Sequence, residues 1–269
     1  MTHVTVLGWD RTVLELKMDS REKEAVFFSF LFPILLLTLF AVIFDDQFEG
    51  ATGPMAEMTA ARYFLPGMIS AGVLLTSFQT LALSVTTERD DGTLKRLRST
   101  PMPPVAYFLG KVGLVAITAV AQLAALLAVA SVAFGVPLPD GPGRWWTLTW
   151  VFVLGSVSGS VLGIAYSSLA SARSAGAVVT GPLLALQFIS GGYIAFDGIP
   201  GWLQQVAALF PLKWIAQGMR SVFYPDALAS MEMAGAWEHQ RTAVVLVAWS
   251  VIGLILCVTT FRWYRRGTV

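Results

Sequence analysis

Charged residues and leucines gather in one short stretch that separates two long apolar runs of the chain. The stretch covers residues 88–104, reads ERDDGTLKRLRSTPMPP, and is followed closely by Gly110 and Lys111. None of these residue types at this spacing forms a nucleophile with a base, or a metal ligand set. The chemistry that the stretch offers is recognition of another protein.

The order of residues inside this stretch predicts a short helix. Gly92 permits a break in the chain, and Thr93 is expected to cap the helix that follows it. Leu94 and Leu97 are three residues apart, so they share one side of the helix and can act as apolar knobs for a partner's groove. The basic residues Lys95, Arg96 and Arg98 project elsewhere as a rim. From the pattern alone, a solvated charged loop stays open as the alternative.

Other kinds of site find little support in the sequence. The two histidines, His3 and His239, lie outside the apolar runs, and Cys257 is the single cysteine. An intrachain disulfide framework and a cysteine-based zinc site are therefore excluded, and no metal site or catalytic residue is expected. The P-loop pattern is absent too, because Lys111 is followed by Val112 and lacks the upstream glycine.

The elements that must position the stretch are membrane spans. Of the 269 residues, 55% are hydrophobic and 13% charged, against about 25% charged in soluble domains. A helix needs about 20 apolar residues to cross a bilayer. Six stretches without an ionisable side chain meet that length, so an all-α polytopic membrane protein is predicted; the spans are 25–44, 63–87, 112–136, 145–172, 174–196 and 242–261.

Lysine and arginine predict the orientation, because loops that stay in the cytoplasm are enriched in them. Six spans put both ends on one side. If that side is the cytoplasm, its segments hold 13 basic residues and the outer segments five, namely Arg62, Arg144, Lys213, Arg220 and Arg241. We therefore expect both termini in the cytoplasm. The net charge of +1 gives no field that would draw nucleic acid, so no nucleic-acid partner is expected.

Two further patterns concern packing. Residues 1–24 mix apolar and charged side chains and predict an amphipathic helix on the cytoplasmic membrane surface. In the fourth span, Gly155, Gly159 and Gly163 recur every four residues, which predicts a bare helix face that another helix can approach closely.

The stretch at 88–104 resembles the loop that marks ABC-2 type transporter permeases, Glu-Arg-Glu-x-x-Gly-Thr-Leu-x-x-Leu, then Ser/Thr-Pro and Gly-Lys. The positions that match are Glu88, Arg89, Gly92, Thr93, Leu94, Leu97, Thr100, Pro101, Gly110 and Lys111. Asp90 stands where the family has Glu and keeps the charge. A second similarity runs from Ser190 to Arg220, although the proline that the family has near Phe196 and Asp197 is absent. Within the family, the chain resembles the daunorubicin-type multidrug resistance exporters.

This resemblance implies how the protein is powered. It implies that residues 88–104 form a coupling helix that contacts an ATPase subunit through Glu88, Arg89, Gly92, Thr93, Leu94, Leu97, Thr100 and Pro101. It also implies two copies of that ATPase and a second permease copy, as a homodimer or pseudodimer in the cell membrane. No cofactor is expected in this chain, because ATP and Mg²⁺ would be bound by the ATPase.

Residues 197–241 carry two apolar stripes at helical spacing, each too short to cross a bilayer. A helical hairpin that dips into the outer leaflet fits them, with an interfacial cap as the alternative. The resemblance implies re-entrant helices that form an extracellular gate, with the residues Gly191, Gly192, Pro200, Trp202, Pro211 and Arg220.

The resemblance further implies a substrate path along spans one, two and five, for which the candidates are Phe78, Gln79, Gln187, Phe188 and Tyr193. Their apolar and aromatic character favours export of a hydrophobic or amphipathic substrate, such as a drug, an antibiotic or a lipid. Glycan export by the same architecture is the runner-up. An ion-coupled carrier is disfavoured because no span holds an ionisable residue, and an intramembrane protease because no span holds a histidine. A membrane subunit without transport stays open.

Overall fold

The computed structural model describes residues 2–21, 27, 31–50, 52–100, 102–194 and 196–261; for Thr2, His3 and Asp197 it describes the backbone only. Within these ranges every regular element is a helix, and no strand occurs. The prediction of an all-α protein is therefore confirmed. Pro101, part of the predicted coupling helix, lies outside the described residues, as do Lys23 and residues 262–269.

In the described part of the chain, four helices are long and apolar enough to cross a membrane. The first, Ala60–Asp90, consists of α4 (Ala60–Leu74), the π-helical turn η4 (Leu75–Gln79) and α5 (Thr80–Asp90). The others are α7 (Pro104–Phe134), α8 (Gly141–Tyr166), which runs on into the 3-10 turn η5 (Ser167–Leu169), and α12 (His239–Thr260). They occupy the places of the predicted second, third, fourth and sixth spans.

Shorter apolar helices occupy the other two places. The first predicted span, 25–44, contains α3 (Phe32–Ile43), and residues 25, 26 and 28–30 of it lie outside the described part. The fifth, 174–196, contains the π-helical turn η6 (Gly176–Thr180) and α9 (Gly181–Ile189). Among the described residues there are thus four helices of spanning length and two shorter apolar ones, where the sequence predicts six spans.

Local sequence explains where these helices begin and end. The Thr59 side chain caps α4 by accepting a hydrogen bond from the Arg62 backbone N–H at 3.2 Å. Helix α7 begins at Pro104, which needs no backbone partner in the first turn, and ends at Gly135, whose φ of 64° closes it in the left-handed region. The predicted third span starts after Lys111, but α7 starts earlier, because Lys111 is paired inside the protein and does not stop the helix.

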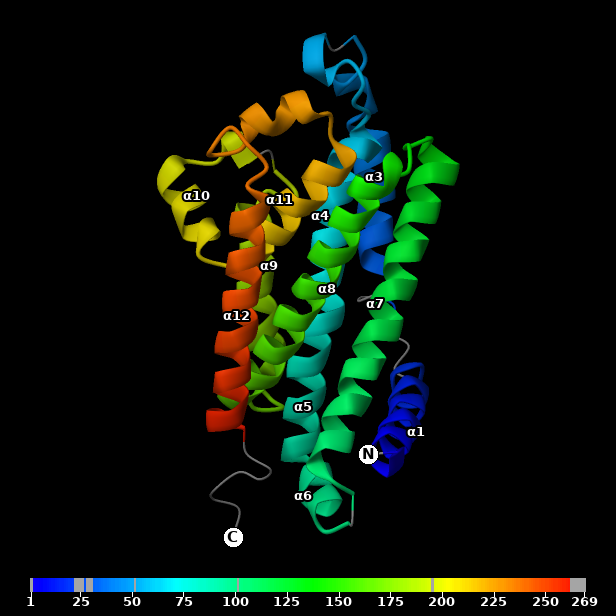
Figure 1. The fold of residues 1–269 in the computed structure, drawn as a ribbon, viewed down its shortest axis with the longest axis vertical. Helices are drawn as coiled ribbons and strands as arrows, with labels where there is room; N and C mark the ends of the chain where they lie inside the picture. Colours follow the sequence, from blue (N-terminus) through cyan, green and yellow to red (C-terminus); the bar gives the residue numbers. More distant parts are fainter. Residues whose placement is uncertain are drawn as a thin grey trace.

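The long helices run side by side, and distinct groups of short helices lie at their two ends (Figure 1). Helices α1 (Thr2–Asp19) and α6 (Thr93–Arg98) lie at the end where α12 finishes, which we call the α6 end. Helix α10 (Gly201–Ala208) and the 3-10 turn η8 (Asp226–Met231) lie toward the other, which we call the α10 end.

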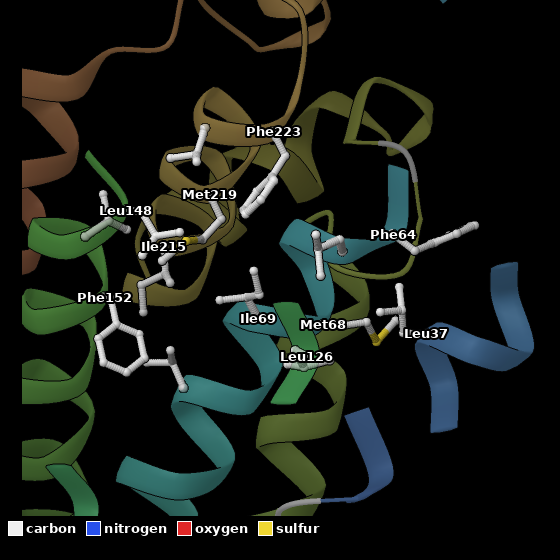
Figure 2. Packing of buried hydrophobic residues seen from close by; sticks show 14 of the residues in the cluster. Leu37, Phe64, Met68, Ile69, Leu126, Leu148, Phe152, Ile215, Met219 and Phe223 are labelled. Atoms are coloured by element: carbon white, nitrogen blue, oxygen red, sulfur yellow. The ribbon is translucent and has the colours of Figure 1, made fainter. Parts of the chain in front are cut away.

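Helix α4 lies at the centre of the bundle. Figure 2 shows its side chains Met68 and Ile69 among residues of α3, α7, α8 and α11 (Pro211–Phe223), and all of these belong to one buried apolar cluster. The glycine stripe of α8 allows this packing. A Cβ on Gly159 would lie 2.1 Å from Ser77 Oγ, and one on Gly163 would lie 2.4 Å from the Phe78 carbonyl oxygen. The predicted close approach is confirmed.

Candidate functional site

Helix α6 connects the ends of α5 and α7 and is entered through a left-handed glycine. Gly92 has a φ of 80°, a conformation that costs other residues more than glycine. The Thr93 backbone N–H donates to Asp91 Oδ1 at 2.8 Å. Asp91 therefore satisfies the first N–H of the helix, and the expectation that Thr93 provides the cap was wrong. The break at Gly92 and the six-residue helix α6 that follows it are as the sequence predicts.

The two leucines of α6 differ in burial, because Leu94 lies in the protein's own core and Leu97 is partly buried beside it. Leu94 is 0% exposed and belongs to an apolar cluster with Leu81, Val85, Tyr107, Val115 and Ile164, against which Leu97 packs. The expectation that Leu94 acts as a knob for a partner was therefore wrong, because burying it fixes α6 on the bundle. The outward surface of α6 is polar, with Lys95, Arg96, Arg98, Ser99 and Thr100 exposed.

A hollow of about 230 Å³ lies beside this polar surface, lined by Leu97, Arg98, Met102 and Pro104. Its wall combines apolar side chains with a guanidinium group. A partner can therefore engage α6 through both an apolar contact and a charge.

Four charged side chains meet where α1, α5 and α7 come together, and we call them the buried charge cluster: Arg11, Glu15, Glu88 and Lys111. Lys111 Nζ donates to Glu88 Oε1 at 2.7 Å and to Glu15 Oε2 at 2.8 Å. Arg11 Nη2 lies 2.5 Å from Glu15 Oε1 and 3.4 Å from Glu88 Oε1. All four side chains are buried, Lys111 completely.

Neutral groups complete the cluster. The Tyr107 hydroxyl donates to Glu88 Oε2 at 2.7 Å, and Lys111 Nζ lies 2.6 Å from Ser84 Oγ. Two cations balance two carboxylates. Buried charges are tolerated when they are paired and hydrogen-bonded, and loss of one member leaves another uncompensated. Glu88 therefore links the helix that leads into α6 to two neighbouring helices.

Glycines let α1 lie close enough to α7 for these pairs to form. A Cβ on Gly110 would lie 2.3 Å from Arg11 Cγ, and one on Gly113 would lie 2.2 Å from Thr12 Oγ1. The adjacent residues Gly110 and Lys111 therefore have separate roles: Gly110 makes room for Arg11, and Lys111 binds Glu15. Sequence reasoning missed the cluster, although Arg11 and Glu15 are spaced four apart, as helical ion pairs are.

Helix α1 has the predicted helical structure, but it buries two of its charged side chains and leaves some apolar ones exposed. Arg11, Thr12 and Glu15 are buried against the bundle, whereas Val6 and Trp9 are 58% and 62% exposed. An amphipathic helix in water would do the opposite. The exposed apolar side chains, which lie beside the charged Asp10 and Lys17, are suited to contact with lipid.

Arg89 and Asp90 connect the end of α5 to the turn that follows α8. Arg89 donates through Nη1 to the Ser167 carbonyl at 2.8 Å and through Nη2 to the Ala170 carbonyl at 2.7 Å. Asp90 Oδ2 accepts from the Ala172 N–H at 2.7 Å. Arg89 thus ties α5 to this turn, because its guanidinium binds the carbonyl groups of Ser167 and Ala170 there.

The candidate path residues fall into two groups. The Tyr193 hydroxyl donates to Gln187 Oε1 at 2.7 Å, and its ring packs edge-on against Phe188 and against Phe40 of α3. Phe78 and Gln79 lie elsewhere, in η4, where the Phe78 ring is 5.5 Å from that of Tyr166 in α8. The structure brings Gln187, Phe188 and Tyr193 together and places the other two residues apart.

Three of the candidate gate residues meet. Arg220 Nη1 donates to the Gly191 carbonyl at 3.0 Å, and Arg220 Nε donates to Glu232 Oε1 at 2.6 Å. Gly192 presses its carbonyl oxygen against α4, where a Cβ on Gly67 would be 1.8 Å away. Pro211 begins α11, the helix that carries Arg220. Pro200 and Trp202 are exposed around the start of α10.

Helix α11 is wholly buried, although it carries two cations. Burial lowers the pKa of Lys213 to about 8, against which the nearby Glu232 acts only partly. Lys213 Nζ donates to Gln217 and lies 3.9 Å from the centre of the Trp214 ring. Burial acts to lower the pKa of Arg220 as well, but its ion pair with Glu232 outweighs this and raises the pKa. Both cations are engaged inside the protein, so neither is a free site for an anionic head group.

In the part of the chain that the structure describes, no three residues among His, Cys, Asp and Glu gather as metal ligands would. The site therefore consists of α6, the buried charge cluster beneath it and the helices that these join.

Comparison with known proteins places this arrangement in a family. The sequence profile described as ABC-2 family transporter protein matches residues 49–263. The inner membrane transport permease YadH of Escherichia coli K12 is 22% identical over 230 residues, which cover 82% of this chain and 85% of YadH. The probable multidrug ABC transporter permease YbhR of the same strain is 22% identical over 176 residues, or 65% of this chain. That alignment covers 47% of YbhR, so this chain spans about half the length of that relative.

Proposed function

Because the chain belongs to the ABC-2 family of transporter proteins, we propose that it is the membrane permease of an ATP-driven exporter in the cytoplasmic membrane. The observation that carries the proposal is the position of α6. Leu94 fixes this helix on the bundle, and the outer surface of the helix is basic. Glu88, near the end of α5 that leads into α6, belongs to the buried charge cluster.

In this proposal the α6 end faces the cytoplasm, which agrees with the distribution of basic residues in the loops. A separate ATPase, bound to two ATP molecules with Mg²⁺ as a dimer, docks against Lys95, Arg96 and the hollow beside Arg98. Two copies of that ATPase and two permeases form the complex. The chain itself supplies no nucleotide site.

Movement of α6 passes to the bundle through rigid contacts. Leu94 holds α6 on α5 and α7, Lys111 joins α7 to Glu15 of α1, and Arg89 joins α5 to the turn after α8. A displacement of α6 therefore moves several helices together. Paired charges inside the protein have few alternative partners, which favours movement as a unit.

The α10 end faces outward and acts as the gate. Helices α10 and α11 form a re-entrant hairpin, which is supported by the complete burial of α11 and by its 13-residue length. Arg220 holds this hairpin to the carbonyl of Gly191, just beyond the end of α9. Opening the gate would require that bond to break.

A hydrophobic or amphipathic cargo is the substrate class that we propose. Support comes from the aromatic group around Tyr193 and from the similarity to YbhR, which is named a probable multidrug permease. Export of a glycan is the alternative outcome of a transport assay.

Reconstitution tests the proposal directly. The purified chain is placed in vesicles alone, and together with the ATPase that copurifies with it, and accumulation of an amphipathic fluorescent cation is followed with and without ATP. We expect uphill transport only when chain, ATPase and ATP are all present. Transport by the chain alone, driven by ATP or by an ion gradient, would refute it.

A further inference from the structure

A large apolar cavity lies within a single copy of this chain, between α4, α8, α9 and α12. Its volume is about 440 Å³, within the range of about 300–1,000 Å³ that ligand pockets have. Side chains that line it include Phe78, Tyr166, Leu183, Leu186, Trp249 and Leu256. It is distinct from the aromatic group around Tyr193, which does not line it.

The cavity is bordered by aromatic rings toward the α10 end. There the rings of Phe210 and Trp249 stack with their centres 6.4 Å apart, and Trp249 Nε1 donates to the Leu209 carbonyl at 2.8 Å. Toward the α6 end the lining includes Leu169 and Leu256, which are 71% and 39% exposed. The cavity therefore has an opening at that end, on the outer surface of the helix bundle, which we call its mouth.

The length of the cavity corresponds to one half of a bilayer. Its lining on α12 runs from Trp249 to Thr260, and on α8 from Gly159 to Leu169 at the end of η5. At about 1.5 Å of rise per residue, each stretch is about 15 Å long, which is half of a hydrocarbon core about 30 Å thick. The cavity thus has the depth of a single leaflet.

The polar groups at the wall are already satisfied. The Tyr166 hydroxyl donates to the Val178 carbonyl at 3.1 Å, the Ser168 hydroxyl to the Ala165 carbonyl at 2.8 Å, and the Thr260 hydroxyl to the Leu256 carbonyl at 2.6 Å. Water needs several polar partners and leaves apolar cavities dry. A cavity of this size that opens among lipid-facing helices has hydrocarbon as its natural filling, because lipid tails are as apolar as leucine.

We infer that this cavity binds one acyl chain of a phospholipid from the leaflet at the α6 end. The chain lies along α12 between α8 and α9, with its methyl end below Trp249. The head group stays outside the mouth, at the level of the exposed Arg173. The inference concerns a bound lipid and does not depend on transport by this protein.

Photocrosslinking in membranes tests it. The full chain is reconstituted in phosphatidylcholine that carries a diazirine midway along one acyl chain, and adducts are mapped by mass spectrometry. We expect adducts on cavity-facing Leu162, Leu186 and Leu256, and at least one phospholipid per chain that is retained after extensive washing in detergent. Adducts confined to exposed positions such as Val132 and Val258 would overturn the inference.

Variants that fill the cavity provide the matched control. Leu186→Trp from α9 and, separately, Leu162→Trp from α8 should each lower crosslinking to Leu256 at least fivefold. Val132→Trp, on the 87%-exposed outer face of α7, should leave it unchanged. Equal crosslinking in all variants would contradict the assignment. So would displacement of the lipid by an amphipathic photoreactive drug at micromolar concentration, because the cavity would then be a cargo site.

Discussion

Lys111 Nζ lies 2.7 Å from Glu88 Oε1, and this pair joins the two helices between which α6 is suspended. Glu88 comes two residues before the end of α5, and Lys111 is in the second turn of α7, so both lie close to α6 in the chain. The same ammonium group holds Glu15 of α1 at 2.8 Å. One cation thus fixes the relative positions of three helices, and any force on α6 reaches all of them.

Removal of this cation should destabilise the protein strongly. Lys111→Met leaves Glu15 and Glu88 buried with Arg11 as their remaining cation, and the loss of one partner from a buried pair costs about 3–5 kcal/mol. The free energy of unfolding in mixed detergent micelles is the measurement. Lys95→Met, on the exposed surface of α6, is the control and should change it by less than about 0.5 kcal/mol.

A second variant separates charge balance from packing. Glu15→Gln combined with Lys111→Met leaves one cation and one carboxylate, so the double variant should lose less stability than the two single losses together. Additive losses would show that the four side chains do not act as a unit.

The glycine stripe of α8 gives a prediction with a control on the same helix. A methyl group at Gly163 meets the Phe78 carbonyl oxygen, so Gly163→Ala should cost about 1–3 kcal/mol of unfolding free energy through overpacking. At Gly143 a Cβ has no neighbour within 4 Å, and Gly143→Ala should be neutral or stabilise by up to about 1 kcal/mol. Equal effects at both positions would argue against the close crossing of α8 and η4.

Lys213 should make stability depend on pH. Its pKa in the folded protein is about 8 and its ordinary value is 10.5, so the unfolded chain binds the proton more tightly. The free-energy cost of burying the charged Lys213 ammonium group is fully present below pH 8. This cost decreases as the pH rises from 8 to 10.5, so the stability of the folded protein increases over that range. The Lys213→Met variant should not show this increase in stability with pH.

Thermal unfolding of both proteins between pH 7 and pH 10.5 is the measurement. The wild-type midpoint should rise relative to that of Lys213→Met as the pH increases. If the difference between the two unfolding midpoints stays constant with pH, Lys213 keeps its ordinary pKa despite its burial.

Much of the fold follows from the sequence. Apolar runs of about 20 residues can only be buried in lipid or in a large core, so the long helices at 63–87 and 242–261 could be predicted from length alone. Gly155, Gly159 and Gly163 predicted a close crossing because their spacing matches the helix repeat. The helix after Gly92 was predictable from its turn residue and its leucines.

The parts that could not be predicted depend on contacts between distant segments. Nothing local shows that Leu94 is buried by Tyr107 and Ile164. The cap of α6 is a local contact, but Asp91 and Thr93 both offer a side-chain oxygen there, and the residue types alone do not decide between them. The buried charge cluster was missed because Glu88 and Lys111 each lie at the end of an apolar run and resemble a solvated flank, while Arg11 and Glu15 lie in a mixed segment that resembles a surface helix. Only the position of α1 on α7 brings Glu15 to Lys111.

The candidate path could be predicted only in part for a similar reason. Gln187, Phe188 and Tyr193 are neighbours in the chain and remain so in space. Phe78 and Gln79 are in the π-helical turn of the second span, and the rotation that this turn imposes directs Phe78 to Tyr166. Such a turn leaves no pattern in the sequence.

The central claim is that α6 receives the force of an external ATPase. The most direct measurement is ATP-driven transport by the reconstituted complex that carries Lys95→Glu and Arg96→Glu, two exposed changes that leave Leu94 in place, beside Lys17→Glu on the exposed side of α1 as control. We predict that transport falls at least tenfold in the α6 variant while the ATPase alone still hydrolyses ATP, and that the control keeps wild-type transport. Undiminished transport by the α6 variant would contradict the account.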